Sequence, residues 1–316
     1  MALSTEMILT LQQLDGVGNK TIFKIADQAD THITTMESLC KFWKSLKGKK
    51  LQSITADDLE DAHRVALRII SKCKSEDVGI ISFYESIFPE ILKSCVNEEG
   101  KLDPPILLYY RGNLDVLKKL GIAVIGTREP TRNGILAGKH FSGEFAKRGY
   151  NIVSGLAIGC DTTGHQGALA VGGATTAFLA NGLDWDSIYP KENLDLAKEI
   201  VVKRGLLLSE YPVGQSCGRY GLVARDRLQA GLSYATVVVQ TGTMHAVNAT
   251  IQSKKPLFAV EYKTDEDTSN EKVQGNIKLV KEQKAYALRS TGIDDACSII
   301  EKAHKSINPV QQQSLF

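Results

Sequence analysis

The sequence predicts an α/β fold with a doubly wound, mostly parallel sheet and a small all-helical domain in front of it. From Gly121 onward, short apolar runs alternate with amphipathic helical stretches, which is typical of parallel strands joined by crossover helices. Each of these runs is apolar throughout, as expected for a strand that is buried on both faces. The first 75 residues instead carry apolar side chains at helical spacing.

The individual elements follow from the same patterns. Helices are expected over 133–150, over 192–205 and near 293–305, whereas the polar stretch 264–275 is expected to form a surface loop. The candidate strands are 121–126, 151–155, 174–180, 205–209, 235–240 and 256–261. Two further strand-like runs, punctuated by prolines, lie in the segment before Gly121.

The N-terminal region contains the stretch LQQLDGVGNKTIFKIAD, which has the form helix, tight Gly-x-Gly turn, helix. This pattern resembles the helix-hairpin-helix motif of SAM-like domains, in which Gly16 and Gly18 would permit the turn. The backbone N–H groups that follow could then face a phosphate, or the hairpin could simply pack two helices together. We expect a helical domain over 1–75, an α/β domain over 76–306 and a flexible tail over 307–316.

The composition, 43% hydrophobic and 23% charged, is that of an ordinary globular protein. The sequence has no apolar run of about 18 residues and no secretion signal at its start. Its six cysteines lie far apart and form no C-x-x-C pair, which suits a reducing compartment better than a zinc or redox site. These features predict a cytoplasmic protein with no membrane segment and no bound metal.

Charge gives a small hint about partners. The net charge is only +2, but residues 121–263 hold 15 Lys and Arg against 11 Asp and Glu, whereas the segments on either side are close to neutral. The basic excess therefore coincides with the α/β region. A solvated basic face would give the same pattern.

The first strand is followed by GTREPTRNG, a loop of small, polar and basic residues that leads into a helix. In an open parallel sheet, ligands bind at the carboxyl ends of the strands, and a helix N-terminus favours an anion. Gly126, Thr127, Arg128 and Thr131 are therefore candidate phosphate-binding residues. The other strands also end in loops of small and polar residues, which together predict a broad anion-binding surface.

A dinucleotide cofactor fits this loop poorly. The G-x-G-x-x-G fingerprint is absent, because Gly126 is followed by a glycine only at position 134, and the acidic residue expected after the second strand is missing. A hydrolytic set could be drawn from Ser154, Asp161 and His165. We favour the alternative, in which Asp161 caps the helix that follows it and His165 is a packed core residue. No cofactor and no catalytic residue are predicted.

Taken in order, six segments resemble the DNA-processing protein A family, also called DprA or Smf, between about residues 80 and 300. They are GIAVIGTREPTRNG, NIVSGLAIGCDTTGHQGAL, GGATTAFLANGLDWDSIYPKEN, GLLLSEYPVGQ, ARDRLQAGLS and VVVQTGTMHAVNATIQSKKPLFAV. Six motifs in one order are far more specific than any one of them. The resemblance implies an extended Rossmann-like α/β domain.

The resemblance also implies a function. Members of this family bind single-stranded DNA, form dimers through the α/β domain and help to load a RecA-type recombinase during DNA uptake, without catalytic turnover. On this basis Gly126, Thr127 and Arg128 are expected to contact phosphate, and Ser154 and Gly155 to form the floor of the groove. The other expected contacts are Arg225 and Arg227, from the fourth loop, and Thr131 and Thr243. For each arginine, a salt bridge that fixes a loop is the alternative role.

Two departures from the family pattern weaken the expected DNA site. Asp226 stands between Arg225 and Arg227 where asparagine is usual, and Ile158 stands where arginine is common. Both reduce positive charge. They predict weaker DNA binding or a groove adapted to another ligand.

Two other hypotheses are kept. The terminal residues Gln312, Leu315 and Phe316 resemble the peptide by which bacterial proteins bind the replicative sliding clamp, although such a tail could instead fold back onto its own domain. The second hypothesis is a sensor of a nucleotide-derived ligand, or a phosphoribohydrolase-like enzyme of the same superfamily. Hydrolysis is disfavoured, because His245 and Ala246 occupy the place of the catalytic glutamate of those enzymes.

Overall fold

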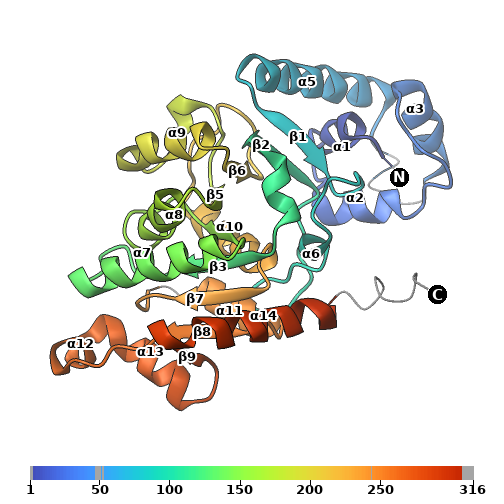
Figure 1. Cartoon of the computed structure of the whole chain (residues 1–316). Helices are drawn as coiled ribbons and strands as arrows, with labels where there is room; N and C mark the ends of the chain where they lie inside the picture. Colours follow the sequence, from blue (N-terminus) through green and yellow to red (C-terminus); the bar gives the residue numbers. More distant parts are fainter. Residues whose placement is uncertain (1–2, 47–50, 52, 243, 308–316) are drawn as a thin grey trace, which may run out of the picture.

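The computed structural model describes residues 3–46, 51, 53–242 and 244–307 (Figure 1). Within these residues a nine-stranded sheet has the order β1-β2-β6-β5-β4-β3-β7-β8-β9. The strands are β1 (Gly79–Ser82), β2 (Leu107–Gly112), β3 (Gly121–Ile125), β4 (Asn151–Ser154), β5 (Ala174–Leu179), β6 (Leu206–Ser209), β7 (Ala235–Val238), β8 (Leu257–Val260) and β9 (Tyr286–Leu288). All pairs from β6 across to β9 are parallel, and β1 and β2 extend the sheet by antiparallel pairing. The predicted α/β, mostly parallel class is confirmed.

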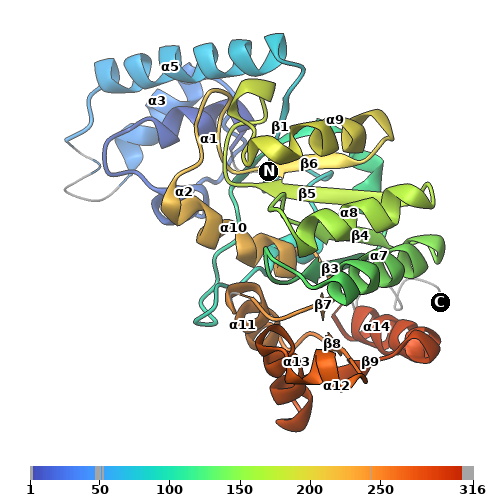
Figure 2. The same ribbon diagram turned by 90° about the vertical axis from the view of Figure 1, so that its left-hand side faces the viewer.

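The sheet is doubly wound about β3. From β3 the chain moves strand by strand to β6 in one direction, and from β7 to β9 in the other. The connecting helices are α7 (Arg132–Lys147), α8 (Cys160–Ala170), α9 (Leu194–Val202), α10 (Arg219–Gly231) and α11 (His245–Gln252). Because parallel crossovers are right-handed, α7, α8 and α9 cover one face, and α11 covers the other (Figures 1 and 2). The carboxyl ends of β3 and β7 therefore meet at the topological switch point, where such sheets bind ligands.

The region after β8 corrects one expectation. The predicted loop 264–275 forms α12 (Asp265–Ser269) and the first turn of α13 (Glu271–Lys281). Thr264 accepts a hydrogen bond from the backbone N–H of Asp267, and Asn270 accepts one from the N–H of Lys272. The polar residues are thus helix caps and first-turn residues, which satisfy N–H groups that a helix leaves free. The chain then ends its described part in β9 and α14 (Ile293–Ile307).

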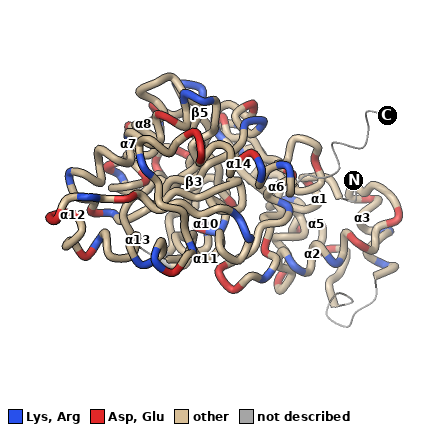
Figure 3. Tube along the Cα trace, turned by 60° about the horizontal axis from the view of Figure 1, so that its bottom comes forward, with Lys and Arg blue, Asp and Glu red and all other residues tan. Residues whose placement is uncertain are grey.

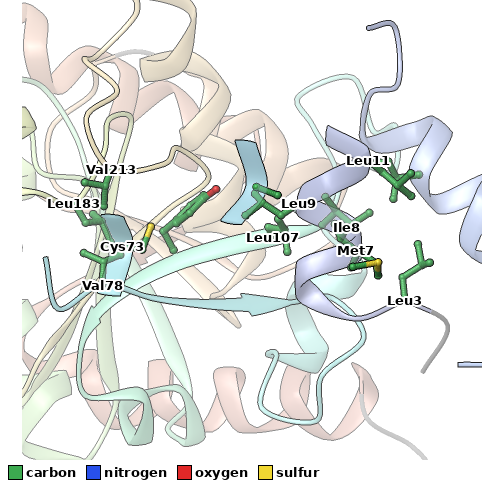
Figure 4. Close-up of a cluster of buried hydrophobic side chains, with 14 of the residues drawn as sticks. Leu3, Met7, Ile8, Leu9, Leu11, Cys73, Val78, Leu107, Leu183 and Val213 are labelled. Atoms are coloured by element: carbon green, nitrogen blue, oxygen red, sulfur yellow. The ribbon is translucent and has the colours of Figure 1, made fainter. Parts of the chain in front are cut away.

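The N-terminal region is helical, as predicted. It contains α1 (Thr5–Gln12), α2 (Asn19–Ala26), α3 (Met36–Ser45) and α5 (Ala56–Ser75), and the short helix α6 (Glu90–Lys93) follows β1. The α1–α2 turn has Gly16 at φ +70°, and Gly18 is the N-cap of α2. Buried side chains of α1 join those of β2 in one cluster, which extends through Leu107 to Val213 (Figure 4). The domain boundaries at 75 and 306 stay a prediction, and this shared core means that the two regions pack directly together.

Some expectations concern residues that the structure does not describe. Thr243 and the tail residues Gln312, Leu315 and Phe316 lie outside the described residues. Among the helices that are described, none is long and apolar enough to cross a membrane.

Candidate nucleic-acid interface

The predicted phosphate loop lies at the switch point. Residues 126–131 leave the end of β3, and α7 begins directly after them. Thr131 is the N-cap of α7, and its side-chain oxygen accepts a hydrogen bond from the N–H of Gly134 at 3.1 Å. The N-terminus of α7 thereby lies next to four of the predicted residues: Gly126, Thr127, Arg128 and Thr131. This is the place where backbone N–H groups and the helix dipole favour an anion.

Gln240, which the sequence analysis did not single out, holds this loop from the other side of the switch point. It follows β7 and is fully buried. Its backbone carbonyl accepts from the N–H of Thr127 at 2.9 Å, and its side-chain Oε1 accepts from the N–H of Thr131 at 2.8 Å. Its Nε2 donates to the Thr131 hydroxyl at 2.8 Å. One residue thus fixes both ends of the loop, and a polar residue at the end of the apolar run VVV was the available signal.

Gly159 packs directly against the backbone of the loop. It is the N-cap of α8, with φ +87° and ψ −126°, a conformation that only glycine adopts readily. A Cβ at this position would lie 2.5 Å from the backbone carbonyl oxygens of Thr127 and Arg128. The next N–H, of Cys160, donates to the Thr127 carbonyl at 3.0 Å. The loop therefore rests directly on the start of α8.

A cavity of about 460 Å³ opens beside the loop. Its walls come from the loop itself, from the first turn of α8, from α10 and from the start of α11. In the view of Figure 3, Lys and Arg residues are interspersed with Asp and Glu residues along the chain. The local charges of the cavity wall therefore decide what it can bind.

Arg128 is the exposed cation of this cavity. It lines the wall, and its guanidinium makes no hydrogen bond or ion pair with any residue that the structure describes. An arginine held at a loop and without an internal partner is available for an external anion. The geometry is consistent with the predicted phosphate contact.

Arg225 is placed differently. It lies on α10, not in a loop as expected, and it is 6% exposed. Its guanidinium lies 3.4 Å from Asp161 on one side and 3.4 Å from Asp226 on the other. A Cβ on Gly155 would be only 1.3 Å from its Nη1, so the arginine packs flat against that glycine. The structure places Arg225 in the alternative role, a salt bridge that fixes the cavity wall.

Arg227 also lies on α10, because this part of the expected fourth loop is helical. Its guanidinium is paired with both carboxylate oxygens of Glu210, at 2.8 and 2.9 Å, and with Asp103 at 2.6 Å. It does not line the cavity. Arg227 is likewise in the salt-bridge role, and contact with nucleic acid stays only a prediction for both arginines.

Ser154 and His165 are core residues. Ser154 is fully buried, and its hydroxyl donates to the Val124 carbonyl at 2.6 Å. His165 is also fully buried, with its ring nitrogens 2.7 Å from the Thr175 hydroxyl and 2.6 Å from the Gly155 carbonyl. Burial lowers the pKa of His165, which favours the neutral ring. Ser154 and Gly155 thus support the wall from behind, and no Ser–His pair forms.

Asp161 corrects a detail of the prediction. The helix starts one residue before it, with Gly159 as N-cap, so Asp161 lies in the first turn and is not the cap. Its carboxylate accepts from the backbone N–H of Ala157 at 3.2 Å and faces Arg225. It therefore stabilises the start of α8 and neutralises the buried arginine.

Two acidic features complete the cavity. Burial raises the pKa of Asp226 to about 6, although Arg225 opposes this shift. At the rim, Nδ1 of His245 lies 2.7 Å from the carboxylate of Glu98. Among the described residues, no group of three or more His, Cys, Asp or Glu side chains is placed to hold a metal ion.

Comparison with known proteins identifies the family. The family model for DNA recombination-mediator protein A matches residues 79–301. The chain belongs to this family. The DNA processing protein DprA of Bacillus subtilis is 30% identical over 241 residues, which cover 70% of this chain and 78% of that protein. Six further curated relatives are aligned over 35 to 56% of their own length.

Solved structures agree with this assignment to the DNA recombination-mediator protein A family. The DNA processing protein A of Streptococcus pneumoniae has a TM-score of 0.69 at 24% identity, covers 94% of this chain and shows the same fold. The comparison spans 98% of that structure. The DNA processing protein A of Helicobacter pylori, described for its single-stranded DNA binding mode, has a TM-score of 0.56 at 26% identity. The comparison covers 72% of this chain and 96% of that structure. The predicted family is confirmed.

Proposed function

We propose that this chain is a non-enzymatic DNA-processing protein, which binds single-stranded DNA and assists a RecA-type recombinase during DNA uptake and recombination. The observation that carries the proposal is Arg128, an exposed cation with no ion-pair partner among the described residues, on a fixed loop that leads into the N-terminus of α7 at the switch point. The printed description of the Helicobacter pylori relative supports the nucleic acid, and the family name supports the recombinase.

The charges around the loop suit a phosphate chain. Arg132, in the first turn of α7, is exposed like Arg128 and pairs with no carboxylate among the described residues. Two such cations beside a helix N-terminus can neutralise successive phosphates, and the release of counterions then makes binding dependent on salt. The buried arginines of α10 are already neutralised and contribute little to this effect.

Arg128→Ala is expected to weaken binding of single-stranded DNA by about tenfold and to lower the salt slope of log K by about 1, because one phosphate contact is lost. Fluorescence anisotropy over a series of salt concentrations measures both quantities. Lys302→Ala removes an exposed cation from α14 and is the matched control, with no expected change. An unaltered slope in folded Arg128→Ala protein would contradict the phosphate role.

The proposal excludes nucleotide cleavage, and this part has its own test. Incubation of the chain with nucleoside monophosphates should release no free base when the products are separated by chromatography. Release of base that is lost in Asp226→Asn or Asp161→Asn would instead support the phosphoribohydrolase-like alternative, because these are the carboxylates that α8 and α10 place in the cavity wall.

The proposal also includes self-association through the edge of the sheet at β9. Tyr286 on β9, the edge strand of the described sheet, is 55% exposed, and Ile277 on α13, the helix before β9, is 39% exposed, so this end of the sheet carries exposed apolar side chains. Tyr286→Lys is expected to shift a dimer to monomer in sedimentation velocity. Val202→Lys, which changes an exposed apolar residue of α9, should leave the association unchanged; equal behaviour of the two variants would argue against this interface.

A further inference from the structure

The cavity beside the phosphate loop has two chemically different walls. The outer wall is the loop, in which Arg128 offers an exposed positive charge and the carboxylate of Glu129 lies 3.7 Å from Nζ of Lys272. The inner wall, formed by α8 and α10, offers acceptors: the carboxylates of Asp161 and Asp226 and the side-chain amide of Gln229. This division bears on how a nucleotide would lie in the cavity.

The hydrogen-bond acceptors of the inner wall are held in place, but not all of them receive a hydrogen bond. Gln229 is 2% exposed, and its Nε2 donates a hydrogen bond to Oδ1 of Asp226 at 3.0 Å. The Nε of Arg225 lies 3.4 Å from the same oxygen. The other oxygen of Asp226, Oδ2, makes no hydrogen bond with a described residue. Oε1 of Gln229 also has no partner among the described residues, but it is closed off from the cavity. Unpaired acceptors in a cavity wall are costly and call for a donor.

A phosphate does not fit this inner wall. Asp161 and Asp226 carry two negative charges there, and the single arginine between them, Arg225, is already shared by both. A phosphate group would therefore meet like charge at close range, which is unfavourable in a partly buried site. A group with N–H donors and no charge would instead satisfy the free oxygens.

We propose that the inner wall reads a base of the bound single strand, with Asp226 as the residue that accepts from it, and that it favours guanine. This inference rests on the proposed function. The Watson–Crick edge of guanine carries two adjacent donors, N1–H and the 2-amino group, whereas the edges of the other bases place ring or carbonyl acceptors next to their donor. Those acceptors would face the carboxylate and repel it, and thymine, with two carbonyl oxygens beside one N–H, fits worst.

The rest of the cavity is compatible with this occupant. Its volume of about 460 Å³ is sufficient for one nucleotide, and Leu222, Val223 and Ala246 supply apolar surface for a base. Arg128 stands on the opposite wall, where the phosphate of the same nucleotide would lie. The base assignment also gives a role to Asp226, the residue that departs from the family's usual asparagine.

The test compares a thymidine oligonucleotide with one of equal length in which a few separated thymidines are replaced by guanosines. The unmodified chain should bind the guanosine-containing strand about tenfold more tightly, the discrimination typical of one good base contact. Asp226→Asn, which replaces one acceptor with a donor, should abolish the difference between the two strands. Asp295→Asn, on exposed α14, makes the same charge change far from the cavity and should keep the preference.

A second measurement varies the pH. Because the pKa of Asp226 is raised to about 6, its carboxyl group becomes protonated and loses an acceptor as the pH falls below that value, so the guanosine preference should decline there. Arg225 on α10, Asp161 on α8, His245 on α11 and Arg128 in the loop face the same carboxyl group. Asp226→Asn is the control for this measurement, since the variant should show no pH-dependent preference.

The outcomes distinguish the two proposals. Equal binding of both strands by the unmodified chain, or a preference that survives in Asp226→Asn, would overturn the base assignment and leave DNA binding intact. Failure to bind either strand would overturn the proposed function and the base assignment with it.

Discussion

Glu210→Ala is expected to lower the free energy of unfolding by about 3 to 5 kcal/mol, because it leaves the buried guanidinium of Arg227 without its bidentate partner. Arg227 is 8% exposed, and the remaining partner, Asp103, is more open to water. Water can therefore replace little of what Glu210 provides. Urea unfolding followed by circular dichroism measures the change.

Glu37→Ala is the matched control for this prediction. It also removes a glutamate from an ion pair, with Lys41, but both side chains of that pair are highly exposed, so no measurable change is expected. The outcome bears on the role of Arg227. If Glu210→Ala protein were as stable as the unmodified chain and bound DNA more tightly, Arg227 would return to the predicted phosphate role.

Gly159→Ala is expected to destabilise the chain by about 3 kcal/mol or more and to abolish DNA binding at the loop. The methyl group would require a strained backbone at φ +87° and would lie 2.5 Å from the carbonyl oxygens of Thr127 and Arg128. Since those atoms belong to the backbone, the loop itself must move. Thermal unfolding and an anisotropy titration measure the two effects.

Gly172→Ala distinguishes the effect of backbone strain from the effect of a contact between the new methyl group and the loop. Gly172 also has a positive φ, +66°, but a Cβ there would meet nothing within 4 Å. It should cost about 1 kcal/mol from the backbone conformation alone and leave DNA binding unchanged. Equal effects of the two variants, or DNA binding retained by folded Gly159→Ala protein, would show that the loop does not depend on the start of α8.

The sheet could be predicted because most of its strands have a clear pattern in the sequence. β3 to β8 are buried on both faces, so each is an apolar run, and only their ends differ by one or two residues from expectation. β9 was not among the expected strands, because its apolar run, residues 285–288, is short, and Tyr286 and Ala287 are exposed at the sheet edge. Gly218, Gly221 and Gly231 favour a loop over the segment of α10, but Gly218 is the N-cap of this helix and Gly231 is its last residue.

The site was harder to predict, because its residues are defined by partners distant in sequence. Arg128 and Arg225 look equivalent in the sequence, and only the fold places Asp161 against the second one. Gln240 lies 109 positions from Thr131, so their hydrogen bonds could not be inferred from local patterns. Fold class and loop position follow from periodicity, whereas the pairing of charges depends on tertiary packing.

The double attachment of Gln240 has a consequence for binding. Because its amide satisfies both the N–H and the hydroxyl of Thr131, and its carbonyl holds Thr127, the loop cannot shift without exposing buried polar groups. The phosphate loop is therefore preorganised, and a ligand loses little free energy in ordering it. Association should be governed by diffusion and charge, with no slow closing step of this loop.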